Sequence, residues 1–430
     1  MIKKSSATKE YIKRFSTYFV VDSINKALPF LIMPILAAYL TTDEFGLVSN
    51  FSAIIQVAYA IIALNTYTKL STDFFKKQDS LPSLYTNLST VNFYAFTFVL
   101  LLVIVLNRVL EKAFFLHLKW QIVAVIIAFS MSVITLCTTY LQMKGKVKKY
   151  GIVQLGQSLS FFMLCVLFVV VFLWSWEGRI ISSFISYSVC AIAIFIVAIK
   201  KNLIHFKAFN KELTWQYFLW GIPLLPHALS FWLKYGADKI IISNYIGLSE
   251  NGIYSLALSL GGLTAIVNTS FFNTYSPYLY KKLHSFDETD YYNEKAAIIN
   301  RLVNNSIYFI LTNAIMSLLT YGVLLVLINL FFSGDYLSAI CYLPYTILAN
   351  FISCIYSIYS GFLFYRGKTK MIGTITFSSA ILQVILNLTL IPLLGVWGAI
   401  WSAISVAIII SSTICVLSFK EYNILFYIKK

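Results

Sequence analysis

Residues 118–173 read LKWQIVAVIIAFSMSVITLCTTYLQMKGKVKKYGIVQLGQSLSFFMLCVLFVVVFL, two long apolar runs on either side of the short basic segment QMKGKVKK. Each run is as long as the ~20 residues that an α-helix needs to cross a bilayer. The basic segment between them is too short to form a domain, so the pattern predicts two membrane-spanning helices joined by a tight turn. The same pattern recurs along the chain and decides the fold class.

The composition of the whole chain agrees with a membrane protein. Of the 430 residues, 59% are hydrophobic and 12% are charged, against about 25% charged residues in a soluble domain. The apolar windows predict an all-α polytopic membrane protein of about 12 transmembrane helices in two blocks of six. The predicted spans are 16–40, 45–68, 85–107, 118–141, 150–173 and 180–199, then 216–246, 252–276, 303–331, 338–364, 371–393 and 395–419.

The basic residues predict the orientation of these spans. Of 33 Lys and Arg, 26 fall at the two termini and in alternate connections, and only Arg108, Lys112, Lys119 and Arg179 fall in the opposite connections. Since Lys and Arg near span ends are retained on the cytoplasmic side, both termini are expected to be cytoplasmic. The first apolar run follows a basic N-terminus without a small-residue cleavage site, which favours a span over a removable signal peptide.

The two blocks of spans resemble each other. Residues 43–49, DEFGLVS, align with 249–255, SENGIYS, at an offset of 206, and residues 144–146, KGK, align with 366–368, RGK, at an offset of 222. Each pair lies at the same point of its block, and an even number of spans per block makes the repeat parallel. We therefore expect an N-terminal lobe over 1–206 and a C-terminal lobe over 207–430, joined by a basic connector at 199–215 on the cytoplasmic surface.

With these features the chain resembles the polysaccharide-unit flippases, the O-antigen and capsule repeat-unit exporters of the MOP exporter superfamily. The most specific part of the resemblance is DKIII at 238–242 with YIG at 245–247 and NGIYSLA at 251–257. The resemblance implies two pseudo-symmetric six-helix lobes arranged as a V, as in MATE transporters, with a central cavity. It also implies alternating access for an undecaprenyl-pyrophosphate-linked oligosaccharide in the bacterial inner membrane.

Charged residues inside predicted spans are the first candidates for a site, because a charge at the bilayer centre costs about 3 kcal/mol on insertion scales. Asp22 and Lys26 lie four residues apart in the first span, with Asn25 alongside, and Lys234 and Asp238 repeat this spacing in the seventh. The four-residue spacing predicts a shared helix face for each pair. Spans 1 and 7 line the cavity in the family, so the resemblance implies that Lys26, Lys234 and, more weakly, Lys239 attract the pyrophosphate.

The carboxylates Asp22 and Asp238 are expected to tune these lysines or to carry a coupling proton or sodium ion. Alternatively, each Asp and Lys pair simply neutralises itself, or the lysines extend to the membrane surface. Possible glycan contacts are Asn25, Asn65, Lys69, Asn268 and Asn273. Candidate gating prolines, which would bend spans 1 and 7, are Pro29, Pro34, Pro223 and Pro226.

The residues predict a transporter more readily than an enzyme. No group of His, Cys or carboxylates has metal-ligand spacing, and no nucleophile motif or phosphate-binding glycine loop is visible, so neither a metal nor a cofactor is expected. The net charge of +16 is explained by membrane topology, so no nucleic acid partner is predicted. The expected partners are the lipid-linked oligosaccharide, membrane lipids, a proton or sodium gradient and polysaccharide polymerase machinery. The alternatives are a cation-coupled drug antiporter of the same fold and a membrane-embedded glycan polymerase or ligase.

Overall fold

The computed structural model describes residues 21, 24, 25, 27–75 and 80–428, and every regular element in this part of the chain is a helix. Ten of these helices are long and apolar enough to cross a membrane. The chain divides into two compact units, unit 1 (Met1–Trp232) and unit 2 (Leu233–Lys430). The predicted all-α membrane fold is confirmed.

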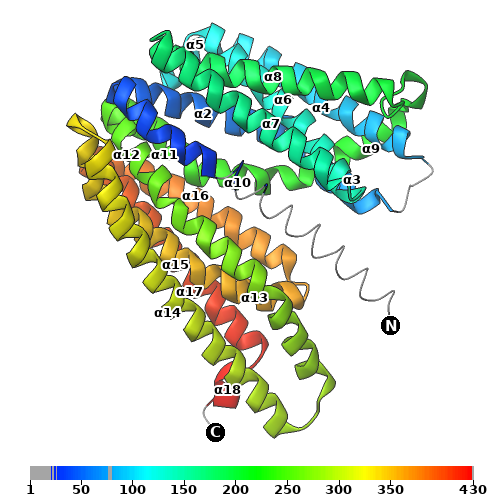
Figure 1. Cartoon of the computed structure of the whole chain (residues 1–430). Helices are drawn as coiled ribbons and strands as arrows, with labels where there is room; N and C mark the ends of the chain where they lie inside the picture. Colours follow the sequence, from blue (N-terminus) through cyan, green and yellow to red (C-terminus); the bar gives the residue numbers. More distant parts are fainter. Residues whose placement is uncertain (1–20, 22–23, 26, 76–79, 429–430) are drawn as a thin grey trace. The chain divides into compact units, whose positions relative to one another are not determined.

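Unit 1 is built around α6, which packs against α2, α3, α4, α7 and α8. Ala58, Ile62, Val99, Val125 and Ala128 form an apolar cluster at its centre. Figure 1 labels α2 to α10 of this unit. The elements of unit 1 are a helix over Ala27–Tyr39, α2 (Thr42–Ala63), α3 (Thr66–Asp73), α4 (Leu81–Val105), α5 (Asn107–Phe114), α6 (Leu118–Met143), α7 (Val147–Cys165), the π-helix η2 (Val166–Val171), α8 (Ser175–Lys200), η3 (Phe206–Ala208), α9 (Lys211–Gly221), η4 (Ile222–Leu224) and the first part of α10 (Leu225–Tyr235).

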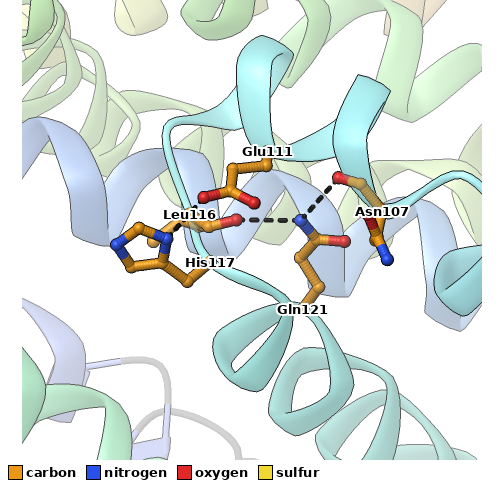
Figure 2. Close-up of polar contacts among 5 residues, drawn as sticks. All are labelled: Asn107, Glu111, Leu116, His117 and Gln121. Carbon is orange, nitrogen blue, oxygen red and sulfur yellow. Dashed lines mark hydrogen bonds and ion pairs between the residues drawn. The ribbon is translucent and has the colours of Figure 1, made fainter.

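The predicted outer connection at 108–117 contains a short ordered helix, α5. The side chain of Gln121, fully buried at the start of α6, donates to the carbonyl oxygen of Leu116 at 2.8 Å and to that of Asn107 at 3.3 Å (Figure 2). In the same turn, Glu111 pairs with the ring of His117. These contacts join side chains of α5 and α6 to the connection between the two helices, so they fix the path from α5 into α6.

The basic connector is attached to unit 1 by a buried asparagine. Asn87 of α4 has no exposed surface, and its side chain accepts from the backbone N–H of Asn210 and the hydroxyl of Thr214, both at 2.8 Å. It also donates to the carbonyl oxygen of Ala208 at 3.0 Å. These bonds hold the start of α9 against α4, within unit 1, which extends to Trp232. The lobe boundary expected after residue 206 stays a prediction.

Unit 2 is built around α15, which packs against α12, α13, α14 and α17. Its longest helix, α14, has 40 residues, or about 60 Å at 1.5 Å per residue, twice the ~30 Å hydrocarbon core. In Figure 1 this helix runs beside α13 and α15. The elements of unit 2 are α11 (Ala237–Tyr245), α12 (Leu248–Gly261), α13 (Leu263–Glu288), α14 (Tyr292–Phe331), η5 (Gly334–Ser338), α15 (Ala339–Tyr365), α16 (Thr369–Leu394), α17 (Val396–Glu421) and α18 (Ile424–Ile428).

Two of the twelve predicted spans differ from simple long helices. In span 1 the described helix covers Ala27–Tyr39 and stays helical through Pro29 and Pro34. Predicted span 7, 216–246, is divided into α9, η4, α10 and α11. Pro223 lies within the 3₁₀ segment η4, and Gly236 separates α10 from α11. Pro223 removes one backbone donor where η4 interrupts span 7, and the second interruption lies at Gly236.

The internal repeat is confirmed at the ends of equivalent helices. The offset of 206 brings the start of α2 onto the start of α12, and the offset of 222 brings the starts of α6, α7 and α8 within one residue of those of α15, α16 and α17. Gly145 and Gly367 both have positive φ angles, 65° and 71°. The next residues donate equivalent backbone bonds, Lys146 to Leu141 at 2.9 Å and Lys368 to Leu363 at 3.0 Å. This is the Schellman ending of a helix, formed twice.

Candidate functional site

Each unit contains a polar pocket of its own. The unit 2 pocket has a volume of about 70 Å³ and contains Lys234 and Asp238. The unit 1 pocket has a volume of about 320 Å³ and contains Arg179. The unit 2 pocket is lined by α10, α11, α12, α15, α16 and α17, and the unit 1 pocket by the start of the Ala27–Tyr39 helix with α6, α7 and α8. The pockets therefore occupy equivalent places in the two repeats.

Lys234 and Asp238 meet in the unit 2 pocket, but not on one helix face. The prediction that both side chains share the face of one continuous helix is wrong, because α10 ends at Tyr235 and α11 begins at Ala237 after Gly236. Gly236 has φ −133° and ψ −37°, outside the α-helical region. Within the described residues no ion pair joins Lys234 to Asp238, and Lys239 does not line the pocket.

The carboxylate of Asp238 is held by two donors. It is 2% exposed, accepts from the hydroxyl of Tyr254 at 2.6 Å, and accepts from the backbone N–H of Lys239 at 2.8 Å. Asp238 also lies in the first turn of α11, where the helix dipole favours a negative charge. The surrounding side chains include Tyr345, Asn350 and Gln383. A volume of about 70 Å³ admits an ion or a few water molecules but no sugar ring.

The unit 1 pocket contains a cation that the sequence assigns to an outer connection. Arg179 lies in the second turn of α8, because this helix starts at Ser175, five residues before the predicted span. Its guanidinium carbon is 4.2 Å from the centre of the Phe161 ring, and its Nη1 donates to the hydroxyl of Ser183. One sequence signal could have placed Arg179 within the helix. Arg179 lies just before an apolar window, and helices often begin several residues before their apolar run.

The other predicted contacts are divided among several places. Asn25 lies in the unit 1 pocket, where its side-chain oxygen accepts from the hydroxyl of Ser158. Asn65 follows α2 with φ 54° and accepts from the hydroxyl of Tyr67 at 3.3 Å. Lys69 pairs with Asp73 at 3.0 Å and lies 5.3 Å from the centre of the Trp220 ring.

Asn268 is buried in unit 2, where it donates to the carbonyl oxygen of Asn350 at 2.9 Å and accepts from the side chain of Asn313. The backbone of Asn273 belongs to α13, and its side chain is outside the described part. Pro226 is the second residue of α10. Asp22 and Lys26 lie outside the described residues. The structure thus brings Lys234 together with Asp238 in one unit, and Asn25 together with Arg179 in the other.

Comparison with known proteins gives one family and one fold. The family model of polysaccharide biosynthesis proteins matches residues 12–282. Protein 1 of the Lsg locus of Haemophilus influenzae is 22% identical over 377 residues, which cover 85% of this chain and 88% of that protein.

Two solved transporters share the fold over nearly the whole chain. An inward-facing multidrug resistance MATE family transporter of the MOP superfamily superposes with a TM-score of 0.68 at 12% identity, covering 94% of this chain and 96% of that one. The lipid II flippase MurJ in an inward closed conformation superposes with a TM-score of 0.62 at 14% identity, covering 94% and 87%. The fold predicted from the resemblance to MOP exporters is therefore confirmed.

Proposed function

The chain belongs to the polysaccharide biosynthesis protein family, and from this premise we propose that it is a non-enzymatic flippase for undecaprenyl-pyrophosphate-linked oligosaccharide units. It would move these units from the cytoplasmic to the outer leaflet of the bacterial inner membrane for O-antigen or another surface polysaccharide. The observation that carries the proposal is the family match over residues 12–282. The fold shared with a lipid II flippase supports it, because that fold accommodates transport of a lipid-linked glycan.

Under this proposal the lysines of spans 1 and 7 attract the diphosphate. Lys234 would act through its charge, together with Lys26 and, more weakly, Lys239, and this does not require the diphosphate to enter the small unit 2 pocket. The 26 basic residues at one predicted side support a cytoplasmic location of both termini. The same side would receive the substrate from the enzymes that build it, and polymerase machinery would take it up outside.

A proton or sodium gradient would drive the cycle through Asp238, with Asp22 as the equivalent group of span 1. Asp238 is buried with two donors in a volume of about 70 Å³, which suits exchange of an ion better than binding of a glycan. The interrupted span 7 supplies segment ends at Pro223 and Gly236 that could absorb the backbone change of alternating access. Pro226 and the prolines of span 1, Pro29 and Pro34, are the other candidate gating residues.

Transfer in liposomes tests the proposal. The purified chain is reconstituted with a fluorescent undecaprenyl-diphosphate oligosaccharide, and the labelled lipid reaching the opposite leaflet is measured by quenching from outside. Wild type should transfer the lipid, and Lys234→Ala should lower the rate at least about tenfold, the effect of ~1.4 kcal/mol. Lys281→Ala is the matched control, because Lys281 is an exposed lysine of α13 outside the pocket. No transfer by wild type under either a proton or a sodium gradient would exclude the flippase.

The second candidate is a cation-coupled drug antiporter of the same fold. The buried carboxylate of Asp238 favours it, because such a group could carry the coupling cation that is exchanged for the drug. Efflux of a fluorescent organic cation from the same liposomes, lost in Asp238→Asn and retained in Lys234→Ala, would support the antiporter. Transfer of the lipid-linked oligosaccharide without efflux of the organic cation supports the flippase.

A further inference from the structure

The unit 1 pocket holds an arginine whose hydrogen-bonding capacity is largely unused. Among the described residues, the Arg179 side chain donates to the hydroxyl of Ser183, and its guanidinium lies over the Phe161 ring. Its Nε is buried with no hydrogen-bond partner in the described part of the chain. A guanidinium offers five donors in a plane that fits a carboxylate or a phosphate with two parallel bonds. Leaving such a group short of acceptors is costly, so the pocket is better suited to a charged occupant than to an empty state.

The other side chains of this pocket are amides, hydroxyls and rings. Gln154 and Gln157 come from α7, Thr135 and Thr138 from α6, and Tyr187 from α8. No carboxylate lines the pocket among the described residues. Amide and hydroxyl groups can both donate and accept, as sugar hydroxyls do. With a volume of about 320 Å³, the pocket lies at the lower end of the range for small-molecule sites, ~300–1,000 Å³.

The charge of the pocket distinguishes two anionic occupants. A diphosphate carries at least two negative charges, whereas the described lining supplies one guanidinium. A sugar carboxylate carries one charge, which a single arginine can match with two bonds. The remaining ring hydroxyls of such a sugar would face the amides and hydroxyls of α6 and α7.

We propose that the Arg179 pocket of unit 1 binds the carboxylate of an acidic sugar, so that the transported glycan contains a hexuronic acid or a related carboxylated residue. This inference rests on the proposed flippase function and names its substrate class. Arg179 would bind the carboxylate, and Gln154 and Gln157 would contact the ring hydroxyls. Phe161 would keep the guanidinium plane in place beneath the sugar.

Equilibrium binding to the full chain in detergent tests this site without requiring transport. D-glucuronate and D-glucose are titrated at equal concentrations, and binding is followed by the rise in the unfolding temperature. Glucuronate should stabilise wild type and glucose should not. Arg179→Gln should weaken glucuronate binding at least about tenfold, and Arg179→Lys, which keeps the charge but loses the planar fork, should weaken it less. Arg108→Gln is the matched control, because Arg108 is an exposed arginine of the same unit.

The possible outcomes separate this site from its alternatives. Equal stabilisation by glucuronate and glucose, or binding unaffected by Arg179→Gln, would overturn the proposal. Inorganic pyrophosphate binding that depends on Arg179, without glucuronate binding, would replace the sugar carboxylate by a phosphate group. If Arg179→Gln does not fold, Gln154→Leu retains the arginine and should still weaken binding several-fold.

One further measurement separates the site from the function. Transfer of a lipid-linked glycan that contains a hexuronic acid, measured for wild type in liposomes, reports on the flippase function separately. Its failure together with intact glucuronate binding would remove the function and leave the binding site.

Discussion

Gly145 in unit 1 and Gly367 in unit 2 end equivalent helices with the same left-handed turn, yet the pockets beside these helices differ in charge and in size. The unit 1 pocket, about 320 Å³, has a guanidinium, and the unit 2 pocket, about 70 Å³, has a carboxylate and an ammonium. Helix ends depend on backbone geometry that a repeat must keep in order to fold. Pocket side chains are free of this constraint, which agrees with the proposal that the unit 1 pocket binds a substrate group and the unit 2 pocket an ion.

The largest expected effect concerns the tight entry into the last long helix of each unit. A Cβ on Gly398 would lie 2.3 Å from the carbonyl oxygen of Leu390, whereas a Cβ on Gly178 would lie no closer than 3.1 Å to any atom. The nearest atoms are backbone at both positions, but the approach at Gly398 is much closer. Gly398→Ala should therefore destabilise the chain by about 3 kcal/mol, and Gly178→Ala by only about 1 kcal/mol. Thermal unfolding in detergent compares the two. A larger loss for Gly178→Ala would show that the two helix entries tolerate crowding differently from these distances.

The next effect compares two tyrosines that support the pockets. Tyr254 donates to the carboxylate of Asp238 at 2.6 Å, and Tyr59 donates to the hydroxyl of Thr135, a lining residue of the unit 1 pocket, at 3.1 Å. Hydrogen bonds to charged groups contribute roughly 1.5–3 kcal/mol, and neutral ones roughly 0.5–1.5 kcal/mol. Tyr254→Phe should therefore lower the unfolding temperature more than Tyr59→Phe. Equal losses would mean that Asp238 does not act as a charged acceptor.

These comparisons also show what the sequence could predict. Apolar windows and the glycines of KGK and RGK identify spans and turns, because both depend on local composition and backbone freedom. The break at Gly236, which changes the relation of Lys234 to Asp238, depends on packing around α10 and α11 and is not visible in hydropathy. The surroundings of Lys69 could be predicted only in part. Its ion-pair partner Asp73 is four residues away in the sequence, but the rings of Tyr217 and Trp220 beside it belong to α9, far along the chain.

Arg179 shows a second limit of the sequence. Hydropathy summed over a sequence window identifies the apolar middle of a span but not where its first helical turn begins. A charged residue at the edge of the apolar window is therefore assigned to the adjoining connection. The described helix starts at Ser175 and brings Arg179 over Phe161. That contact joins two helices, and no pattern within either helix encodes it.

The repeated glycine turns should respond equally to substitution. Gly145→Ala and Gly367→Ala each place a side chain at a positive φ, which costs roughly 1–2 kcal/mol for a residue with a Cβ. Because the turns share the same backbone bonds, the two losses in unfolding free energy should agree within about 0.5 kcal/mol. Thermal unfolding of both single variants and of the double variant measures this. Markedly unequal losses would show that tertiary packing, rather than the turn itself, sets the cost at one of the two positions.

The smallest expected effect compares Glu44 with Glu250, the glutamates that align at the offset of 206. Glu44 forms a capping box with Thr41, accepting from its backbone N–H at 2.9 Å, and also accepts from the hydroxyl of Ser175. Glu250 accepts from the hydroxyl of Tyr342 at 3.5 Å, a weak bond. Both carboxylates gain from the helix dipole, but only Glu44 satisfies an open donor at its helix start.

Glu44→Ala should therefore cost about 1 kcal/mol and Glu250→Ala about 0.5 kcal/mol, measured by thermal unfolding of the purified chain. Thr41→Ala removes the other half of the capping box and should cost little more when added to Glu44→Ala, because the two side chains act as one unit. Full additivity of the two substitutions would mean that the capping box is not what holds this end of α2. The occurrence of a glutamate at this position in both repeats would then reflect the favourable charge of its carboxylate at the helix start.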